Sequence, residues 1–181
     1  MSDFTVTWVT SAAPRFAAAL ADQITLELES SIAYLQLSIA LENHDLPGMA
    51  RWMRLQSDEE RVHAAKFTAH ATDRGLAPQI GAIDSPVIDT SSVVKCFEAS
   101  LAHEKKVSES IRNLYRLAQE VGEIDVIPLL HWFIDEQVEE EASVGEILGR
   151  LRLVGDDGSG LLRIDDQLGS RAGTDAASET D

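Results

Sequence analysis

Four long segments of the chain repeat apolar residues at the 3.6-residue spacing of an α-helix, and a glutamate interrupts each repeat near its middle. Burying one unpaired carboxylate costs several kcal/mol even after relaxation. A whole domain is stabilised by only about 5–15 kcal/mol. Three explanations are therefore possible. The carboxylates point toward water, most of them are protonated, or cations lie between them. The segments cover about residues 14–42, 47–74, 89–122 and 125–154, and the interrupting residues are Glu27, Glu60, Glu104 and Glu140.

The connections between the segments predict two helical hairpins joined by one long crossover. Residues 43–46 and the link before residue 125 are short, which favours antiparallel neighbours. Residues 75–89 reach roughly 50 Å when extended, enough to run the length of a bundle. We expect Asp45 to cap the second helix. The stretch "LLRIDDQL", within about 161–168, predicts a short fifth helix. The expected fold is all-α: a four-helix bundle with a long crossover and a C-terminal helix.

One domain at residues 1–169 accounts for the whole helical pattern. Residues 1–13 form a short N-terminal extension, and the acidic stretch 170–181 is expected to be a disordered tail. The 31 acidic side chains outnumber 15 basic ones, for a net charge of −16, which argues against nucleic acid and anionic membranes as partners. No apolar run is long enough to span a membrane. A single cysteine, Cys96, and an N-terminus unlike a signal peptide favour the cytoplasm.

The side chains beside the four glutamates favour a metal site over a solvated surface. His63 follows Glu60 by three residues, and Gln137 precedes Glu140 by three. For any one glutamate a solvated position is the commoner explanation, but one interior carboxylate on each of four helices is improbable by accident. Four carboxylates carry the charge that two divalent cations balance. Oxygen ligands with one imidazole suit iron or manganese better than zinc.

The order Glu27, Glu60-x-x-His63, Glu104, Gln137-x-x-Glu140 resembles the non-haem ferritins, in particular the bacterial type. The resemblance covers about residues 15–168 and includes "LADQITLELESSIAYLQLS", "DEERVH", "AHE", "HWFIDEQVEEE" and "LLRIDDQL". It implies a ferritin-like di-iron domain. In such a centre Glu27 and His63 bind the first iron, Glu60 bridges both ions, and Glu104 and Glu140 bind the second. Tyr34 and Gln137 would lie beside the centre, although Tyr34 could equally be a core tyrosine.

The resemblance also implies a function and an assembly. The chain would be an iron-storing ferroxidase, oxidising Fe(II) to Fe(III) with O2 or H2O2 at two iron ions per chain. The ferric mineral would be stored in a hollow homo-oligomeric cage, expected to be a 24-mer. Glu59, Glu136 and Glu139 would hold a third iron ion, unless they form only a solvated face. Glu140, next to Glu139, could serve both this group and the centre. Glu136 and Glu139 lie three residues apart and so share one edge of their helix.

Two departures separate the chain from bacterioferritins. That family repeats Glu-x-x-His on the fourth helix, where this chain has Gln137-Val138-Glu139-Glu140. It also binds haem through a methionine after the bridging glutamate, where this chain has Arg61, so no haem is expected. A stand-alone di-iron oxidase or peroxidase of the rubrerythrin type is the alternative function, although that family usually adds paired cysteines. A metal-free acidic helical module would leave four buried carboxylates unexplained.

Overall fold

A computed structural model describes residues 12–170, and within that range it contains five α-helices and no strand. The predicted all-α fold is confirmed. The third helix begins after the predicted "DTSS" stretch, so the crossover is longer than expected, and the first begins two residues before Pro14. The helices are α1 (Ala12–Glu42), α2 (Pro47–Asp73), α3 (Val93–Val121), α4 (Ile127–Val154) and α5 (Gly158–Gly169).

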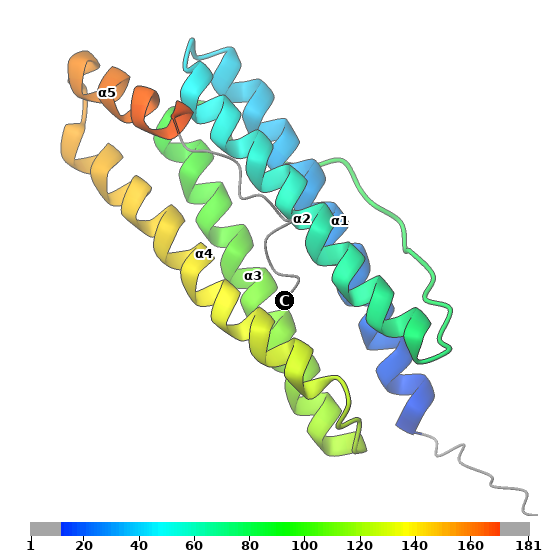
Figure 1. Cartoon of the computed structure of the whole chain (residues 1–181). Coiled ribbons are helices and arrows are strands. Elements are labelled where there is room, and N and C mark those ends of the chain that lie inside the picture. The colour runs from blue at the N-terminus through cyan, green and yellow to red at the C-terminus, as the bar shows by residue number, and fades with distance from the viewer. Residues whose placement is uncertain (1–11, 171–181) are drawn as a thin grey trace, which may run out of the picture.

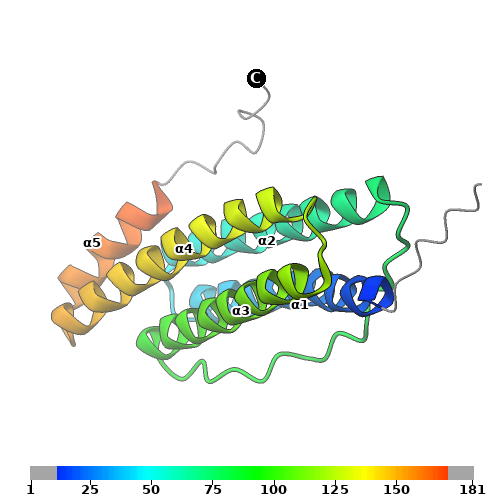
Figure 2. The same ribbon diagram turned by 90° about the horizontal axis from the view of Figure 1, so that it is seen from below.

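Helices α1 to α4 form a bundle of two antiparallel hairpins, and α5 lies across one end (Figure 1). Helix α1 packs on α2 and α3, α3 packs on α4, and α5 contacts α2 and α4. The crossover between α2 and α3 runs along the outside of the bundle beside α1 and α3 (Figure 2). One hydrogen bond attaches it to α1, from Gly81 N to Thr25 Oγ1 at 2.9 Å. The predicted hairpins and long crossover are therefore present.

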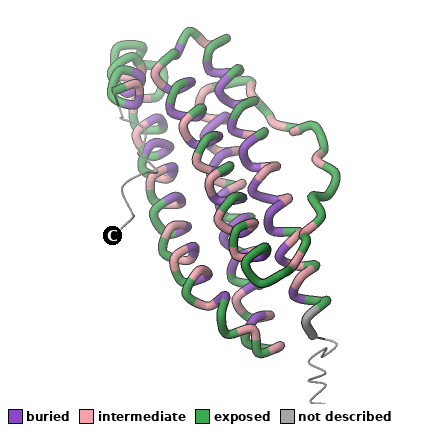
Figure 3. The backbone as a smooth tube through the Cα atoms, turned by 45° about the vertical axis from the view of Figure 1, so that its right-hand side comes forward, coloured by how far each residue is buried: buried purple, intermediate pink, exposed green. Residues whose placement is uncertain are grey.

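The buried faces coincide with the apolar stripes expected from the sequence (Figure 3). Two apolar clusters fill the interior. One, around Trp52 and Phe97, lies toward the end of the bundle that α5 covers. The other, around Phe67 and Phe133, extends to the opposite end. Glu27, Glu60 and Glu104 are buried between these clusters, so the polar section is enclosed by apolar packing at both ends.

The start of α2 differs from the prediction. Asp45 does not cap it: the N-cap residue is Leu46, whose side chain accepts no capping hydrogen bond, and Asp45 has a left-handed backbone with φ of 57°. The capping carboxylate comes instead from α5. Asp165 accepts hydrogen bonds from Gly48 N at 3.1 Å and Met49 N at 2.7 Å. The free N–H groups at the start of a helix can bind an anion from any part of the chain. A prediction from neighbouring residues alone therefore named Asp45 in place of Asp165.

Residues 1–11 and 171–181 lie outside the described range, and with them most of the predicted N-terminal extension and acidic tail. The predicted fifth helix lies inside it and is longer than the quoted motif, with its start capped by Asp157, which accepts a hydrogen bond from Ser159 N. No helix within residues 12–170 combines the length and apolar character needed to cross a membrane.

Candidate metal centre

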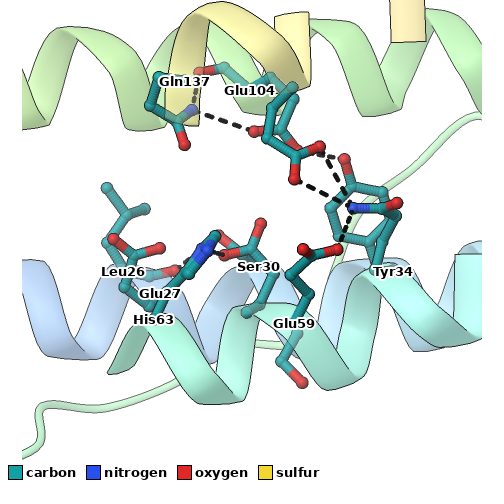
Figure 4. Close-up of polar contacts among 12 residues, drawn as sticks. Leu26, Glu27, Ser30, Tyr34, Glu59, His63, Glu104 and Gln137 are labelled. Atoms are coloured by element: carbon teal, nitrogen blue, oxygen red, sulfur yellow. Dashed lines mark hydrogen bonds and ion pairs between the residues drawn. The ribbon is translucent and has the colours of Figure 1, made fainter. Parts of the chain in front are cut away.

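Glu27, Glu60 and His63 bring their ligand atoms within 4.8 Å of one another at the middle of the bundle. Glu27 comes from α1, and the other two from α2, one turn apart. All three side chains are buried. Glu27 and His63 lie on the α1–α2 side of the interior, facing Glu104 and Gln137 on the α3–α4 side (Figure 4). The structure thus brings these sequence-predicted ligands together.

The two carboxylate oxygens of Glu27 differ in their hydrogen bonding. Gln23, one turn earlier on α1, donates from Nε2 to Glu27 Oε1 at 2.8 Å. Glu27 Oε2 is fully buried and, among the described residues, has no hydrogen-bond donor. A buried carboxylate oxygen beside a second carboxylate requires a proton or a cation between them. Burial, and then the charge of Glu60, raises the pKa of Glu27 well above its ordinary value.

Glu60 is the central carboxylate of the group. Its pKa is raised well above the ordinary value by burial first and then by the negative charge of Glu104, with a further contribution from Glu140. His63 Nδ1 lies 3.3 Å from Glu60 Oε2. The imidazole ring packs edge-on against Phe133 and Trp132, with centroid separations of 5.4 and 5.7 Å. These contacts fix the ring, so that His63 is positioned as a ligand before any cation binds.

Glu104 faces this group from α3, and each of its two oxygens accepts a hydrogen bond from a side chain. Tyr34 donates its hydroxyl to Glu104 Oε1, and Gln137 Nε2 donates to Glu104 Oε2 at 3.1 Å. Burial raises the pKa of Glu104, while these two hydrogen bonds oppose the increase. Tyr34 in turn accepts a hydrogen bond from Ser100 Oγ at 3.0 Å. Tyr34 and Gln137 therefore lie where the resemblance predicted, in contact with a central carboxylate.

A second acidic group lies beside the first. Glu59, Glu136 and Glu140 place carboxylate oxygens within 4.8 Å of one another, with Glu140 buried and the other two half-buried. Gln56 Nε2 donates to Glu140 Oε2 at 3.2 Å and to Glu59 Oε2 at 3.2 Å. Burial raises the pKa of Glu136. This group contains Glu59 and Glu136 of the predicted third site together with Glu140, which was expected to be able to serve both groups. Glu139 does not belong to it and is exposed on α4.

Several residues of the centre carried no predicted role. Gln23 and Gln56 each lie four residues before a central glutamate and donate to a carboxylate of the two groups. Ser108 joins Gln137 to Glu141, at 3.4 and 2.6 Å. Their signal in the sequence was an uncharged polar residue near the glutamates on an otherwise apolar face. Such residues are easily taken for ordinary core polar groups.

The donor set of the two groups suits hard or borderline divalent cations. It contains carboxylate oxygens, glutamine amides and a single imidazole, and the one cysteine in the chain, Cys96, belongs to the apolar cluster around Trp52. Oxygen-rich ligation of this kind favours iron or manganese over a structural zinc ion. The clearest position for a cation is at Glu27 Oε2, the one buried carboxylate oxygen of these groups that lacks a hydrogen-bond partner among the described residues.

Relatives of known structure or function share this chain's sequence and fold. The ferritin-like domain family matches residues 17–154. A bacterial non-heme ferritin of Staphylococcus aureus (strain MRSA252) is 34% identical over 153 residues, covering 84% of this chain and 92% of the relative. A bacterial non-heme ferritin of Escherichia coli O6:H1 is 32% identical over 155 residues, covering 86% and 94%.

A solved structure gives the same assignment. An open-pore ferritin from the hyperthermophilic archaeon Archaeoglobus fulgidus superposes with a TM-score of 0.85 at 34% identity, covering 87% of this chain and 96% of that one. The resemblance predicted from the glutamate and histidine motifs is confirmed by these matches. The chain belongs to the ferritin family.

Proposed function

We propose that this protein stores iron and oxidises it before storage. The observation that supports this most directly is the buried Glu27 Oε2, which has no hydrogen-bond donor among the described residues and lies beside Glu60 and His63. An oxygen in this position is stabilised by a cation. Membership of the ferritin family and the similarity to bacterial non-heme ferritins support iron as that cation.

We assign two ferrous ions to the centre as substrate. Glu27 and His63 bind the first, Glu104 and Glu140 bind the second, and Glu60 bridges them. Four carboxylates balance the charge of two divalent ions, which supports two ions over one. Gln137 and Tyr34 hold Glu104 through hydrogen bonds. The second ion would share the Glu104 oxygens with these two donors, whereas the first ion meets the donor-free Glu27 Oε2, so we expect the first ion to bind more tightly.

The redox chemistry is that of the iron, and the chain supplies ligands and position. With dioxygen as the acceptor, two Fe(II), one O2 and two protons give two Fe(III) and one H2O2. With peroxide, two Fe(II), one H2O2 and two protons give two Fe(III) and two waters. The carboxylates that bind Fe(II) also bind Fe(III), so product leaves most readily toward further oxygen ligands.

We propose that Glu59, Glu136 and Glu140 provide those ligands, with Glu139 at their exposed edge. Glu140 belongs to both groups in this assignment and connects them. Iron held there by oxygen ligands alone, in a partly hydrated place, would bind more weakly than at the centre. The group would therefore act after the paired centre, either taking a further Fe(II) or passing Fe(III) onward.

We propose further that the chain assembles into a closed homo-oligomeric shell of 24 copies. The similarity to ferritins supports assembly. So does a row of large apolar side chains on one face of α1, where Ile32, Leu35 and Ile39 are 39%, 44% and 50% exposed. Positions separated by three and four residues lie on one side of a helix. An apolar row of this kind is suited to contact with a second copy.

One experiment tests storage and oxidation together. Purified protein is loaded anaerobically with Fe(II), exposed to air, and separated by size with iron and protein measured in each fraction. We expect rapid oxidation, with Fe(III) eluting with a protein species of high mass. A stand-alone di-iron oxidase or peroxidase would oxidise Fe(II) without retaining it. Fe(III) that precipitates outside the protein fractions would contradict the storage function.

A further inference from the structure

Gln23 connects the metal centre to a residue far away in the sequence. Its amide is almost fully buried, with 1% of the residue exposed, and both ends of the amide are hydrogen bonded. Nε2 donates to Glu27 Oε1 at 2.8 Å. Oε1 accepts from Ser110 Oγ of α3 at 2.6 Å. The result is a chain of hydrogen bonds from Ser110 through Gln23 to Glu27, crossing from α3 to α1.

The donors in this chain all point toward the carboxylate. Glu27 is ionised when a cation is bound to it and can then only accept hydrogen bonds, so the NH2 end of Gln23 faces it. The Gln23 carbonyl then faces α3, where the Ser110 hydroxyl donates to it. Rotating the amide by 180° would place two acceptors against each other at Glu27. The ionised carboxylate therefore selects the orientation of the amide, and the Ser110 hydroxyl holds the other end of the amide in place.

The chain also determines which oxygen of Glu27 is available. Oε1 is occupied by Gln23, while the fully buried Oε2 has no donor among the described residues and lies in the group with Glu60 and His63. Without the Gln23 bond, the carboxylate could rotate and turn either oxygen, or neither, toward the cation. Mutation of a side chain that holds a metal ligand in place typically lowers metal affinity by about 10–100-fold.

We propose that Gln23 and Ser110 are positioning residues for iron binding: Ser110 orients the Gln23 amide, and Gln23 holds Glu27 so that Oε2 faces the cation. This inference rests on the proposed function, because it assumes that a cation binds between Glu27, Glu60 and His63. Neither residue touches the cation. Their effect is to prepare Glu27 for binding before the ion arrives, which lowers the cost of ordering the ligand on binding.

The test measures Co(II) binding to the intact protein by anaerobic calorimetry and by the visible absorption of bound Co(II), which depends on the number and arrangement of its ligands. We expect Gln23→Leu to weaken the tightest Co(II) site about 10–100-fold and to change the absorption spectrum. Ser110→Ala should have a smaller effect in the same direction. Ser110→Thr keeps the hydroxyl and should restore wild-type binding.

Ser30→Ala is the matched control. Ser30 also joins α1 to α3 by a hydrogen bond, to His103 Nε2 at 2.6 Å, and its other hydrogen bond goes to Leu26 O, so neither of these bonds involves Glu27. This variant therefore removes an α1–α3 hydrogen bond without changing the Gln23 chain, and its Co(II) affinity and spectrum should match wild type. If Ser30→Ala weakens binding as much as Ser110→Ala, a general loosening of the bundle explains both results and the positioning role is wrong.

Three other outcomes bear on the inference. Wild-type affinity and spectrum in both Gln23→Leu and Ser110→Ala would overturn it while leaving the proposed function intact. Absence of a tight Co(II) site in the wild-type protein would overturn the proposed function together with the inference. If Gln23→Leu does not fold, the Ser110→Ala and Ser110→Thr pair decides, because Ser110 is only partly buried and its replacement by alanine leaves little space unfilled.

Discussion

At the scale of single residues, the centre depends on carboxylates that the protein buries at a cost to its own stability. Glu27 and Glu104 are fully buried and Glu60 is 4% exposed. Burial of this kind raises their pKa values, so the metal-free protein reduces the cost by binding protons. A cation bound at the proposed centre would compete with protons for the same oxygens, so metal affinity and stability should both depend on these few side chains.

Glu60→Gln keeps the size of the side chain and removes the bridging charge. We expect the rate of Fe(II) oxidation to fall by at least about 10–100-fold, the range typical of a disturbed metal site. The metal-free variant should melt no lower than the metal-free wild type, because it lacks a buried carboxyl group that must either hold a proton or repel Glu104 and Glu140. Stopped-flow oxidation and thermal unfolding measure the two effects. Oxidation at the wild-type rate would refute the bridging role.

The raised pKa values of Glu27, Glu60 and Glu104 predict how stability depends on pH. Above the ordinary value of 4.5 the unfolded chain loses these protons while the metal-free folded chain keeps them. The folded state then binds more protons, so its free energy of unfolding falls as pH rises. This contribution is complete below about pH 4.5 and is lost as pH rises through the raised pKa values.

The pH effect is measured by difference, because other groups also titrate. Metal-free Glu60→Gln lacks one of the shifted groups, so its stability relative to metal-free wild type should increase as pH rises from about 4.5. Divalent cations hold the carboxylates ionised without repulsion, so loading the wild type with metal should reduce its loss of stability at high pH. A stability difference that is independent of pH would show that Glu60 is not protonated in the metal-free protein.

At the scale of helices, α5 is attached to the bundle through the start of α2. Asp165 is buried and accepts hydrogen bonds from Gly48 N and Met49 N. There is no room for a side chain at Gly48: an added Cβ would lie 2.0 Å from the Asp165 carbonyl oxygen. The absence of a side chain at residue 48 and the carboxylate at residue 165 thus act together to hold α5 against the bundle.

Asp165→Asn should loosen α5 while leaving the metal centre intact. The amide can accept at only one of its two ends and carries no charge, and loss of a helix cap costs about 0.5–2 kcal/mol. Hydrogen exchange of backbone amides in residues 158–169 should become faster, with Co(II) binding unchanged. Asp166→Asn is the control, because Asp166 is exposed one residue away. Equal exchange in both variants would refute the role of Asp165.

The helices and the centre were predictable to different degrees. The large apolar and aromatic residues that repeat at helical spacing along the first segment are all buried, because a 3.6-residue repeat leaves only one face for the core: Phe16, Leu20, Ile24, Tyr34 and Leu41. The central carboxylates stood out for the same reason: they interrupt that face. The bonds from Ser110 to Gln23 and from Asp165 to α2 could not be predicted, because they join residues 87 and 117 positions apart and depend on side-chain direction.

The second acidic group, Glu59, Glu136 and Glu140, was predicted only in part from the spacing of glutamates in the sequence. Glu136 and Glu139 share a helix edge, which predicted a common site. In the structure Glu140 joins Glu59 and Glu136, while Glu139 is exposed. The choice between adjacent positions depends on how far α4 is rotated against α2. That rotation is set by packing of residues such as Phe133 and is not encoded in the spacing of the glutamates alone.

At the scale of the whole molecule, the proposed shell has a defined mass and a defined contact surface. Twenty-four copies of a 19.8 kDa chain, 24 × 19.8, give about 475 kDa. Leu35→Arg places a charge in the exposed apolar row of α1 and should shift the native mass toward smaller species. Gln119→Arg adds the same charge at an exposed position of α3, away from this row, and should keep the wild-type mass. Light scattering that gives only monomer or dimer for the wild type would contradict the shell.

The central claim is that each chain binds two ferrous ions at one buried centre. Anaerobic calorimetric titration of the metal-free protein with Fe(II) tests it most directly, because the number of tight sites per chain is read from the curve without any assumption about oxidation. We expect two tight sites in wild type, with the tighter one lost in His63→Ala and both weakened in Glu60→Gln. A single tight site per chain, or none, would contradict the account.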